Sequence, residues 1–124
     1  MCGIAGFIGS QKIDMQRVKK GCDEMSHRGP DDAGLFHREN QKINVILGHK
    51  RLSIIDLDSR SKQPFYYDNS ILFFNGEIYN YLKIKTDLSN LGHVFKTSSD
   101  TEVLSHALSQ WGSNALSKLE GMWS

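Results

Sequence analysis

The sequence contains few cysteines, no excess of either charge and no long hydrophobic run, and each absence excludes a class of protein. It has two cysteines and no basic segment leading into a long apolar stretch, as a secretory signal would have, so we expect free thiols in a reducing cytoplasm. Lys and Arg number 15 against 14 Asp and Glu, so electrostatics give no reason to expect a nucleic-acid or membrane partner. No apolar run approaches the length of a membrane span.

The composition that remains is typical of a globular protein. The chain has 124 residues, of which 39% are hydrophobic and 10% aromatic, enough for one small domain with one core. No internal repeat, low-complexity segment or linker divides it. We therefore expect a single compact unit.

Apolar periodicity predicts strands with helices between them, which is typical of an α+β fold. Single strands are predicted around 4–8, 71–76 and 94–97, and a pair of strands within 35–55 that turns at 39–42. Helices are predicted over 14–25, 77–92 and 99–111, with one more helical turn within 113–121. Loops rich in breaking residues are expected at 27–34 and 56–69. Gly92 is predicted to end the second helix, and Ser99 with Glu102 has the spacing of a capping box for the third.

Cys2 is the first candidate for chemistry. Removal of Met1 would leave its thiol beside a free α-amino group. A free thiol has a pKa of about 8.5 and an α-amino group one of about 7.7–8.0, so the amine can take the thiol proton near neutral pH and create the thiolate nucleophile. The alternative is that Cys2 is an ordinary small residue buried in a strand.

Seven motifs follow one another between Cys2 and Trp123: CGIAGFIG, HRGPDDAG, GHKRLSIIDL, QPF, FNGEIYNY, SSDTEVL and LEGMW. In this order they resemble the amidotransferase domain of the glutamine-hydrolysing asparagine synthetases, which are class II glutamine amidotransferases with an N-terminal nucleophile. The resemblance implies an α+β fold, the four-layer αββα sandwich of N-terminal-nucleophile hydrolases. Amidotransferases of polysaccharide pathways share the HRGPDD and GHKRLSIIDL pattern, so the ammonia acceptor stays open.

By this resemblance, Cys2 attacks the side-chain amide carbon of L-glutamine, ammonia leaves, and water hydrolyses the thioester. The side-chain amide of Asn75 and the backbone N–H of Gly76 match the family's oxyanion hole. The local alternative is a hairpin, because Asn-Gly is a strong hairpin turn signal. The helix predicted directly after these residues argues against a partner strand there.

Free glutamine carries an α-carboxylate and an α-ammonium group, so its pocket needs a cation and at least one anion. Arg51 offers a planar fork suited to a carboxylate, and Glu77 and Asp100 match the family's ammonium-binding carboxylates. The backbone of Leu52, Ser53, Ile54 and Ile55 would line the pocket. The alternatives are a surface arginine, a first-turn glutamate and an aspartate favoured by a helix N-terminus. Together the three charged positions satisfy both ligand charges, which favours a site.

The loop 27–34 combines a Gly-Pro turn with charged residues, but no further carboxylates or histidines follow at a metal-ligand spacing. We therefore expect no metal and interpret the loop as structural, with Arg28 and its aspartates holding the pocket wall. Cys22 is expected in the core. No nucleotide-binding motif occurs in the chain, so no cofactor is predicted for it, and ATP and Mg are expected only in a synthetase domain.

Residues 1–124 are predicted to be a partial glutamine amidotransferase type 2 domain, without the family's ATP-binding synthetase domain and without the core strands that follow LEGMW. Trp123 would then lie at an open sheet edge, where self-association or a synthetase partner is expected. The predicted function is hydrolysis of L-glutamine to glutamate and ammonia, for transfer to aspartate in asparagine biosynthesis. Two alternatives stay open: transfer to a sugar or another acceptor, and a catalytically silent fragment that acts only as an interaction module.

Overall fold

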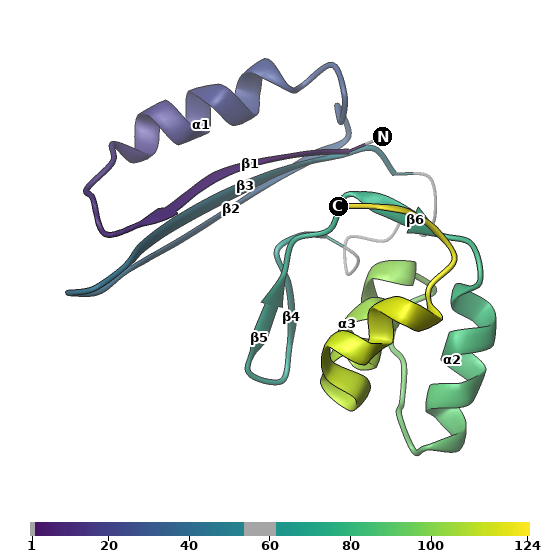
Figure 1. The fold of residues 1–124 in the computed structure, drawn as a ribbon. Helices are drawn as coiled ribbons and strands as arrows, with labels where there is room; N and C mark the ends of the chain where they lie inside the picture. The colour runs from purple at the N-terminus through teal and green to yellow at the C-terminus, as the bar shows by residue number, and fades with distance from the viewer. Residues whose placement is uncertain (1, 54–61) are drawn as a thin grey trace.

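A computed structural model describes residues 2–53 and 62–124 and arranges them in layers (Figure 1). The elements are β1 (Gly3–Gly9), α1 (Met15–Glu24), β2 (Asp32–Glu39), β3 (Asn44–Arg51), β4 (Phe65–Tyr67), β5 (Ser70–Leu72), β6 (Gly76–Ile78), α2 (Tyr81–Asn90), α3 (Asp100–Trp111), the 3-10 segment η2 (Gly112–Lys118) and β7 (Gly121–Trp123). No helix in these two ranges is long and apolar enough to cross a membrane.

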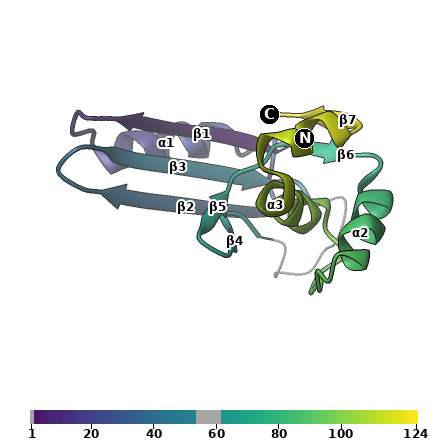
Figure 2. The ribbon, with the colours of Figure 1, turned by 60° about the horizontal axis from the view of Figure 1, so that its bottom comes forward.

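The first half is an antiparallel sheet covered on one face by a helix. β3 is the central strand, with β1 and β2 at its sides, and Figure 2 shows the three strands side by side. Helix α1 lies on one face, where Val18 and Cys22 pack against Ile46 of β3. The strand at 4–8, the helix at 14–25 and the paired strands of 35–55 are thus confirmed, as is the core position of Cys22.

The second half packs two helices beneath short strands. Its hydrophobic cluster joins β6, α2, α3 and η2 and contains Phe74, Ile78, Ile84, Leu88, Val103, Leu104, Ala107, Ala115 and Leu119. Figure 1 shows the layers in the order α1, the three-stranded sheet, the short strands β6 and β7, then α2 and α3. The predicted α+β class, with two sheet layers between helices, is confirmed.

Three predicted elements differ from the structure. The helix predicted over 77–92 begins only at Tyr81, because Gly76–Ile78 forms strand β6 and pairs antiparallel with β7. The strand predicted at 71–76 ends at Leu72, and its partner β4 arises inside the predicted loop 56–69. The segment 94–97 is not a strand, because buried Glu102 takes its backbone N–H groups. In each case tertiary contacts override the local pattern.

Both predicted helix ends near 92 and 99 are present. The N–H groups of Gly92 and His93 donate to Ser89 O and Leu88 O, which closes α2 in a Schellman motif. Ser99 Oγ accepts the Thr101 N–H at 3.1 Å and caps α3.

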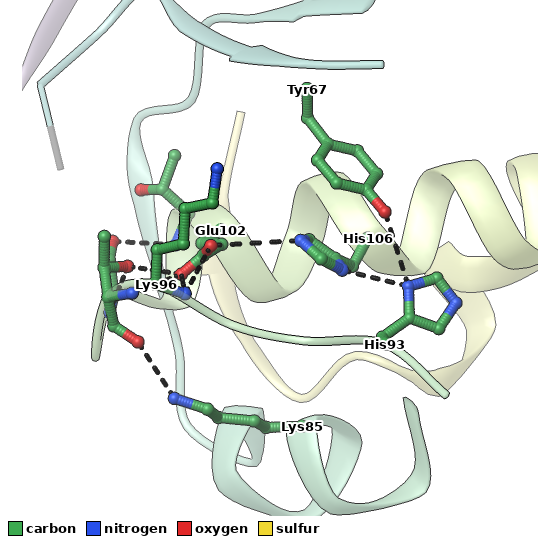
Figure 3. Close-up of polar contacts among 9 residues, drawn as sticks. Tyr67, Lys85, His93, Lys96, Glu102 and His106 are labelled. Carbon is green, nitrogen blue, oxygen red and sulfur yellow. Dashed lines mark hydrogen bonds and ion pairs between the residues drawn. The ribbon is translucent and has the colours of Figure 1, made fainter. Parts of the chain in front are cut away.

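Glu102 does not complete the predicted capping box but reaches the chain that precedes the helix (Figure 3). Its carboxylate accepts the N–H of Lys96 at 2.9 Å, the N–H of Thr97 at 2.7 Å and the Thr97 hydroxyl at 2.7 Å. Nearby, the His106 ring stacks on the ring of Tyr67 in β4, with 3.9 Å between the ring centroids, and on the ring of Phe95, with 4.4 Å between the centroids. These contacts fix the start of α3 and attach β4 to it.

We expect Glu102→Ala to destabilise the protein by about 3 kcal/mol, because three donors, two of them on buried Thr97, lose a charged acceptor. The measurement is the free energy of unfolding in urea. Glu39→Ala is the matched control: among the described residues, the Glu39 carboxylate makes an exposed ion pair with Lys12 at 3.8 Å, so its loss should leave stability unchanged. Equal effects of the two substitutions would contradict the prediction.

Candidate active site

The Cys2 thiol lies against the backbone at the end of β3. The register of the sheet places Gly3 opposite Lys50, so the residue before β1 meets the residues that follow β3. The Leu52 N–H donates to Cys2 Sγ at 3.3 Å, and Sγ lies 3.7 Å from Leu52 O. A backbone N–H that donates to the sulfur stabilises negative charge there.

The loop 27–34 holds this arrangement from the side. Arg28 Nε donates to Cys2 O at 3.2 Å. The Asp31 N–H donates to Arg51 O at 3.0 Å, and Asp31 Oδ2 accepts the Ser53 N–H at 2.7 Å. These contacts tie the loop to Cys2, Arg51 and Ser53, as expected of a structural loop; that it holds a pocket wall stays a prediction.

Asn75 and Gly76 lie where β6 pairs with the end of the chain, not in a hairpin turn. Asn75 and Ser124 exchange both backbone hydrogen bonds, at 3.0 and 2.9 Å, and Gly76 is paired with Trp123. The hairpin alternative is therefore excluded, although the reason given for excluding it, a helix starting at 77, is wrong. A Cβ at position 76 would overlap the Met122 and Trp123 backbone, so this close pairing requires glycine.

The ladder directs the Gly76 N–H away from β7. Hydrogen-bonded and non-hydrogen-bonded pairs alternate in an antiparallel ladder, and the Asn75–Ser124 pair is of the bonded kind. The Gly76–Trp123 pair is then the non-bonded kind. Two residues on, the Ile78 N–H points to the same side as that of Gly76 and donates to Asp100 Oδ2 at 3.1 Å. The Gly76 N–H is thus aimed toward the side of the strand on which Asp100 lies.

The Asn75 carboxamide is also available. Its Oδ1 is buried and has no hydrogen-bond partner within residues 2–53 and 62–124. In β6, Ile78 faces the hydrophobic cluster, so the side chains of Asn75 and Glu77 face the opposite side, toward the three-stranded sheet. Figures 1 and 2 both place β6 at the end of the molecule where β1 begins.

Asp100 and Glu77 form a pair of neighbouring carboxylates. Asp100 is 6% exposed, and burial raises the pKa of its carboxyl group. Hydrogen bonds from the N–H groups of Ile78 and Thr101 act to lower this pKa, while the charge of Glu77 raises it further. A cation placed between the two carboxylates would relieve this repulsion, as the α-ammonium of an amino acid would.

Arg51 ends β3 and is buried, with 7% of its surface exposed. Its charge is one of the influences that lower the pKa of His49, after burial, so its guanidinium lies at this end of the sheet. Leu52 and Ser53 follow it beside Cys2, while Ile54 and Ile55 fall outside the described residues. The structure thus gathers the described candidates into two groups: Cys2, Arg51, Leu52 and Ser53 at the end of β3, and Asn75, Gly76, Glu77 and Asp100 around β6.

Two residues that link these groups had no role in the sequence-based site. His49 and Gln63 both contact the backbone of Phe74, the residue before Asn75. Both lie within motifs that carry the resemblance, GHKRLSIIDL and QPF. That membership is the signal that could have found them.

Comparisons with known proteins identify the family of this chain. The family described as "Glutamine amidotransferase domain" matches residues 1–124. Among similar proteins, asparagine synthetase [glutamine-hydrolyzing] 1 of Bacillus subtilis is 40% identical, and the match covers 99% of this chain and 20% of that protein. A putative asparagine synthetase [glutamine-hydrolyzing] 2 of Methanocaldococcus jannaschii is 34% identical, and the match covers 99% of this chain and 27% of that protein. The chain therefore spans about a fifth to a quarter of the length of these curated relatives.

A solved structure has the same fold. Glutamine phosphoribosylpyrophosphate (PRPP) amidotransferase from B. subtilis, complexed with ADP and GMP, superposes with a TM-score of 0.76 at 26% identity. The match covers 97% of this chain and 33% of that one.

We expect Asp100→Asn to stabilise the protein at pH 7. The folded-state pKa of Asp100 lies above its unfolded value, so the stability that its carboxyl group contributes is present at low pH and is lost as pH rises through the folded pKa. The asparagine Oδ1 can still accept the Ile78 N–H, without a buried charge. The measurement is the urea midpoint of both proteins from pH 3 to 7.

The gain should grow with pH and vanish at pH 3, where both states of the wild type carry the proton. Asp87→Asn, on the exposed face of α2, is the control and should leave the midpoint unchanged at every pH. A lower midpoint for Asp100→Asn at pH 7 would contradict the prediction.

Proposed function

This chain belongs to the glutamine amidotransferase domain family, and we propose on that premise that it hydrolyses L-glutamine to glutamate and ammonia with Cys2 as the nucleophile. The observation that carries the proposal is the aim of the donors at β6. The Gly76 N–H is directed away from β7. The buried Oδ1 of the Asn75 carboxamide, whose Nδ2 would be the second donor, has no partner among the described residues, and both residues lie at the end of the molecule where the Cys2 thiol lies.

The proposed reaction uses these groups in turn. After Met1 is removed, the α-amino group of Cys2 takes the thiol proton, and Sγ attacks the amide carbon of glutamine. The Asn75 amide and the Gly76 N–H stabilise the resulting oxyanion. The protonated α-amino group of Cys2 then gives its proton to the nitrogen of the glutamine side-chain amide, the C–N bond breaks, and ammonia leaves. Water adds to the thioester and gives a proton to the α-amino group of Cys2. The S–C bond then breaks, and the α-ammonium group of Cys2 returns the proton to the sulfur, which leaves glutamate and the free thiol.

Substrate binding uses both charges of free glutamine. Arg51 would bind the α-carboxylate, helped by the backbone of 52–55, and Glu77 with Asp100 would bind the α-ammonium. The burial of Asp100 and the repulsion between it and the half-buried Glu77 support the second assignment. A primary amide without these two charged groups would be bound weakly.

For the fate of the ammonia, we propose transfer to aspartate, because the similar proteins are named glutamine-hydrolysing asparagine synthetases. That step would take place in a synthetase domain or subunit, where ATP and Mg would be needed; the amide hydrolysis requires neither. A reducing cytoplasm suits a thiol nucleophile. Transfer to a sugar stays the second candidate, since PRPP amidotransferase shares the fold.

Self-association through β7 stays a prediction. Met122 and Trp123 on this strand are 54% and 39% exposed. Such an exposed apolar strand suits a protein partner, and a synthetase part would serve as well as a second copy.

Cys2→Ala should abolish glutamate formation from glutamine, and Asn75→Ala should lower kcat by roughly 100- to 1000-fold, because one oxyanion donor is lost. The measurement is glutamate release by the purified chain, with removal of Met1 checked by intact mass. Cys22→Ala is the matched cysteine control: Cys22 lies on α1, is buried against Ile46 of β3 and is not one of the proposed site residues, so its substitution should lower the melting temperature and keep kcat. Turnover by Cys2→Ala, or none by a correctly processed and folded wild type, would sink the proposal.

Asp100→Asn should raise the KM for glutamine by about 10-fold or more, because the α-ammonium loses a buried counter-charge. The test compares glutamine with glutaramate, which has the same amide and carboxylate but no ammonium group. The wild type should prefer glutamine strongly, and the variant should lose most of that preference. Retained preference would show that Asp100 does not contact the ammonium group.

A further inference from the structure

Phe74, the residue before the proposed oxyanion donors, has a buried backbone outside any described strand. It is 4% exposed and belongs to the hydrophobic cluster beneath β6. β5 ends at Leu72 and β6 begins at Gly76, so none of the described strands pairs with it. Buried N–H and C=O groups need partners, and here side chains provide them.

The partners are Gln63 and His49. Gln63 Oε1 accepts the Phe74 N–H at 2.5 Å, and Gln63 Nε2 donates to Phe74 O at 2.8 Å, so the carboxamide pairs with the backbone as a neighbouring strand would. His49 Nε2 lies 3.2 Å from the same oxygen. Burial lowers the pKa of His49, against the effect of this hydrogen bond, so the ring is neutral at pH 7 and Nε2 carries the proton that it donates.

Both partners are fixed to the three-stranded sheet. His49 is 1% exposed and lies on β3 opposite Gly34 of β2. A Cβ at position 34 would overlap the Gln63 carbonyl, so the absence of a side chain there lets the Gln63 backbone lie directly on the sheet. Three residues after His49, Leu52 contacts the Cys2 thiol. The hydrogen bonds of Gln63 and His49 to the Phe74 backbone, which we call the clamp, therefore join the strand that holds the nucleophile to the segment that enters β6.

We propose that Gln63, supported by His49, is a positioning residue that sets the Asn75–Gly76 oxyanion donors at their distance from the Cys2 thiol. This inference rests on the proposed hydrolysis of glutamine. If the clamp loosens, the donors shift relative to the developing oxyanion, while Arg51 of β3 and Asp100 of α3, two of the groups proposed to bind the charged end of glutamine, lie on other elements. Such a shift weakens the transition state more than ground-state binding.

The experiment compares two substitutions at position 63. Gln63→Met keeps the volume and removes both hydrogen bonds. Gln63→Glu keeps the acceptor for the Phe74 N–H but donates to Phe74 O only when its carboxyl group is protonated. Gln41→Met, in the exposed turn between β2 and β3, is the matched control and should behave as the wild type.

We expect Gln63→Met to lower kcat by about 10- to 100-fold while KM stays within about twofold, because a small displacement of catalytic groups has a large effect on rate. For Gln63→Glu, kcat relative to the wild type should rise as pH falls from 7.5 to 5.5, since protonation restores the donor. A folded Gln63→Met with the kcat of the wild type, or with its whole defect in KM, overturns the inference. If Gln63→Met gives no cooperative thermal transition, a pH-independent ratio for Gln63→Glu overturns it.

Amide hydrogen exchange separates this inference from the proposed function. Gln63→Met should speed exchange at the amides of residues 74 and 75 and leave those of β1 and β3 unchanged. If the wild type does not hydrolyse glutamine, the proposed function fails, and faster exchange at 74 and 75 still supports the positional role of the clamp. Unchanged exchange at these amides overturns the clamp whatever the activity of the wild type.

Discussion

The end of β3 is where backbone groups from both halves of the molecule make hydrogen bonds. On one side, Leu52 donates to the Cys2 thiol and Arg51 O accepts the Asp31 N–H. On the other, His49 donates to Phe74 O across the gap between the sheet and β6. Because an unpartnered buried N–H or C=O is costly, the position of β6 relative to the thiol is set by these bonds and not by side-chain packing alone.

The need to pair backbone groups also accounts for the position of Asp100. One of its carboxylate oxygens accepts the Ile78 N–H, and the carboxylate is buried beside Glu77, an arrangement that raises its pKa and does not favour folding. A protein without a ligand for this pair would be more stable with a neutral residue. A loss of stability at a buried carboxylate that lies beside a second carboxylate is typical of a binding site, and a cationic group of a ligand supplies the missing charge.

The parts of the fold that sequence predicts are those whose pattern is local. The apolar spacing of β1 and α1, the two long strands β2 and β3, and the Ser99 cap of α3 all follow from residues close in sequence. β6 could not be predicted this way, because three residues become a strand only through pairing with residues about 45 positions later. The contacts of Gln63 and Glu102 could not be predicted for the same reason: each side chain binds backbone groups that no periodicity in the sequence indicates. The charged and nucleophilic candidates could be predicted from the sequence, because the resemblance to a family identifies them by residue type. The contacts of Gln63 and His49 with Phe74 could not, because they depend on the three-dimensional arrangement of segments far apart in the sequence.

The order Asn-Gly-Glu at 75–77 has a physical reason in the strand that the local pattern concealed. In a strand, residues 75 and 77 project from one face, and Ile78 in the hydrophobic cluster fixes that face as the one toward the sheet. Their side chains start about 6.6–6.8 Å apart along the strand, the rise of two residues. Glutamine carries its amide and its ammonium group at opposite ends of one short side chain, so an amide donor and a carboxylate two positions apart can address both ends at once. Between them, Gly76 turns its N–H away from β7, and only a residue without a Cβ allows the approach of β7 that sets this direction. A helix that began at 77, as the sequence pattern predicts, would turn Glu77 away from the face of Asn75. The continuation of the strand to Ile78 is therefore the conformation that the proposed chemistry requires.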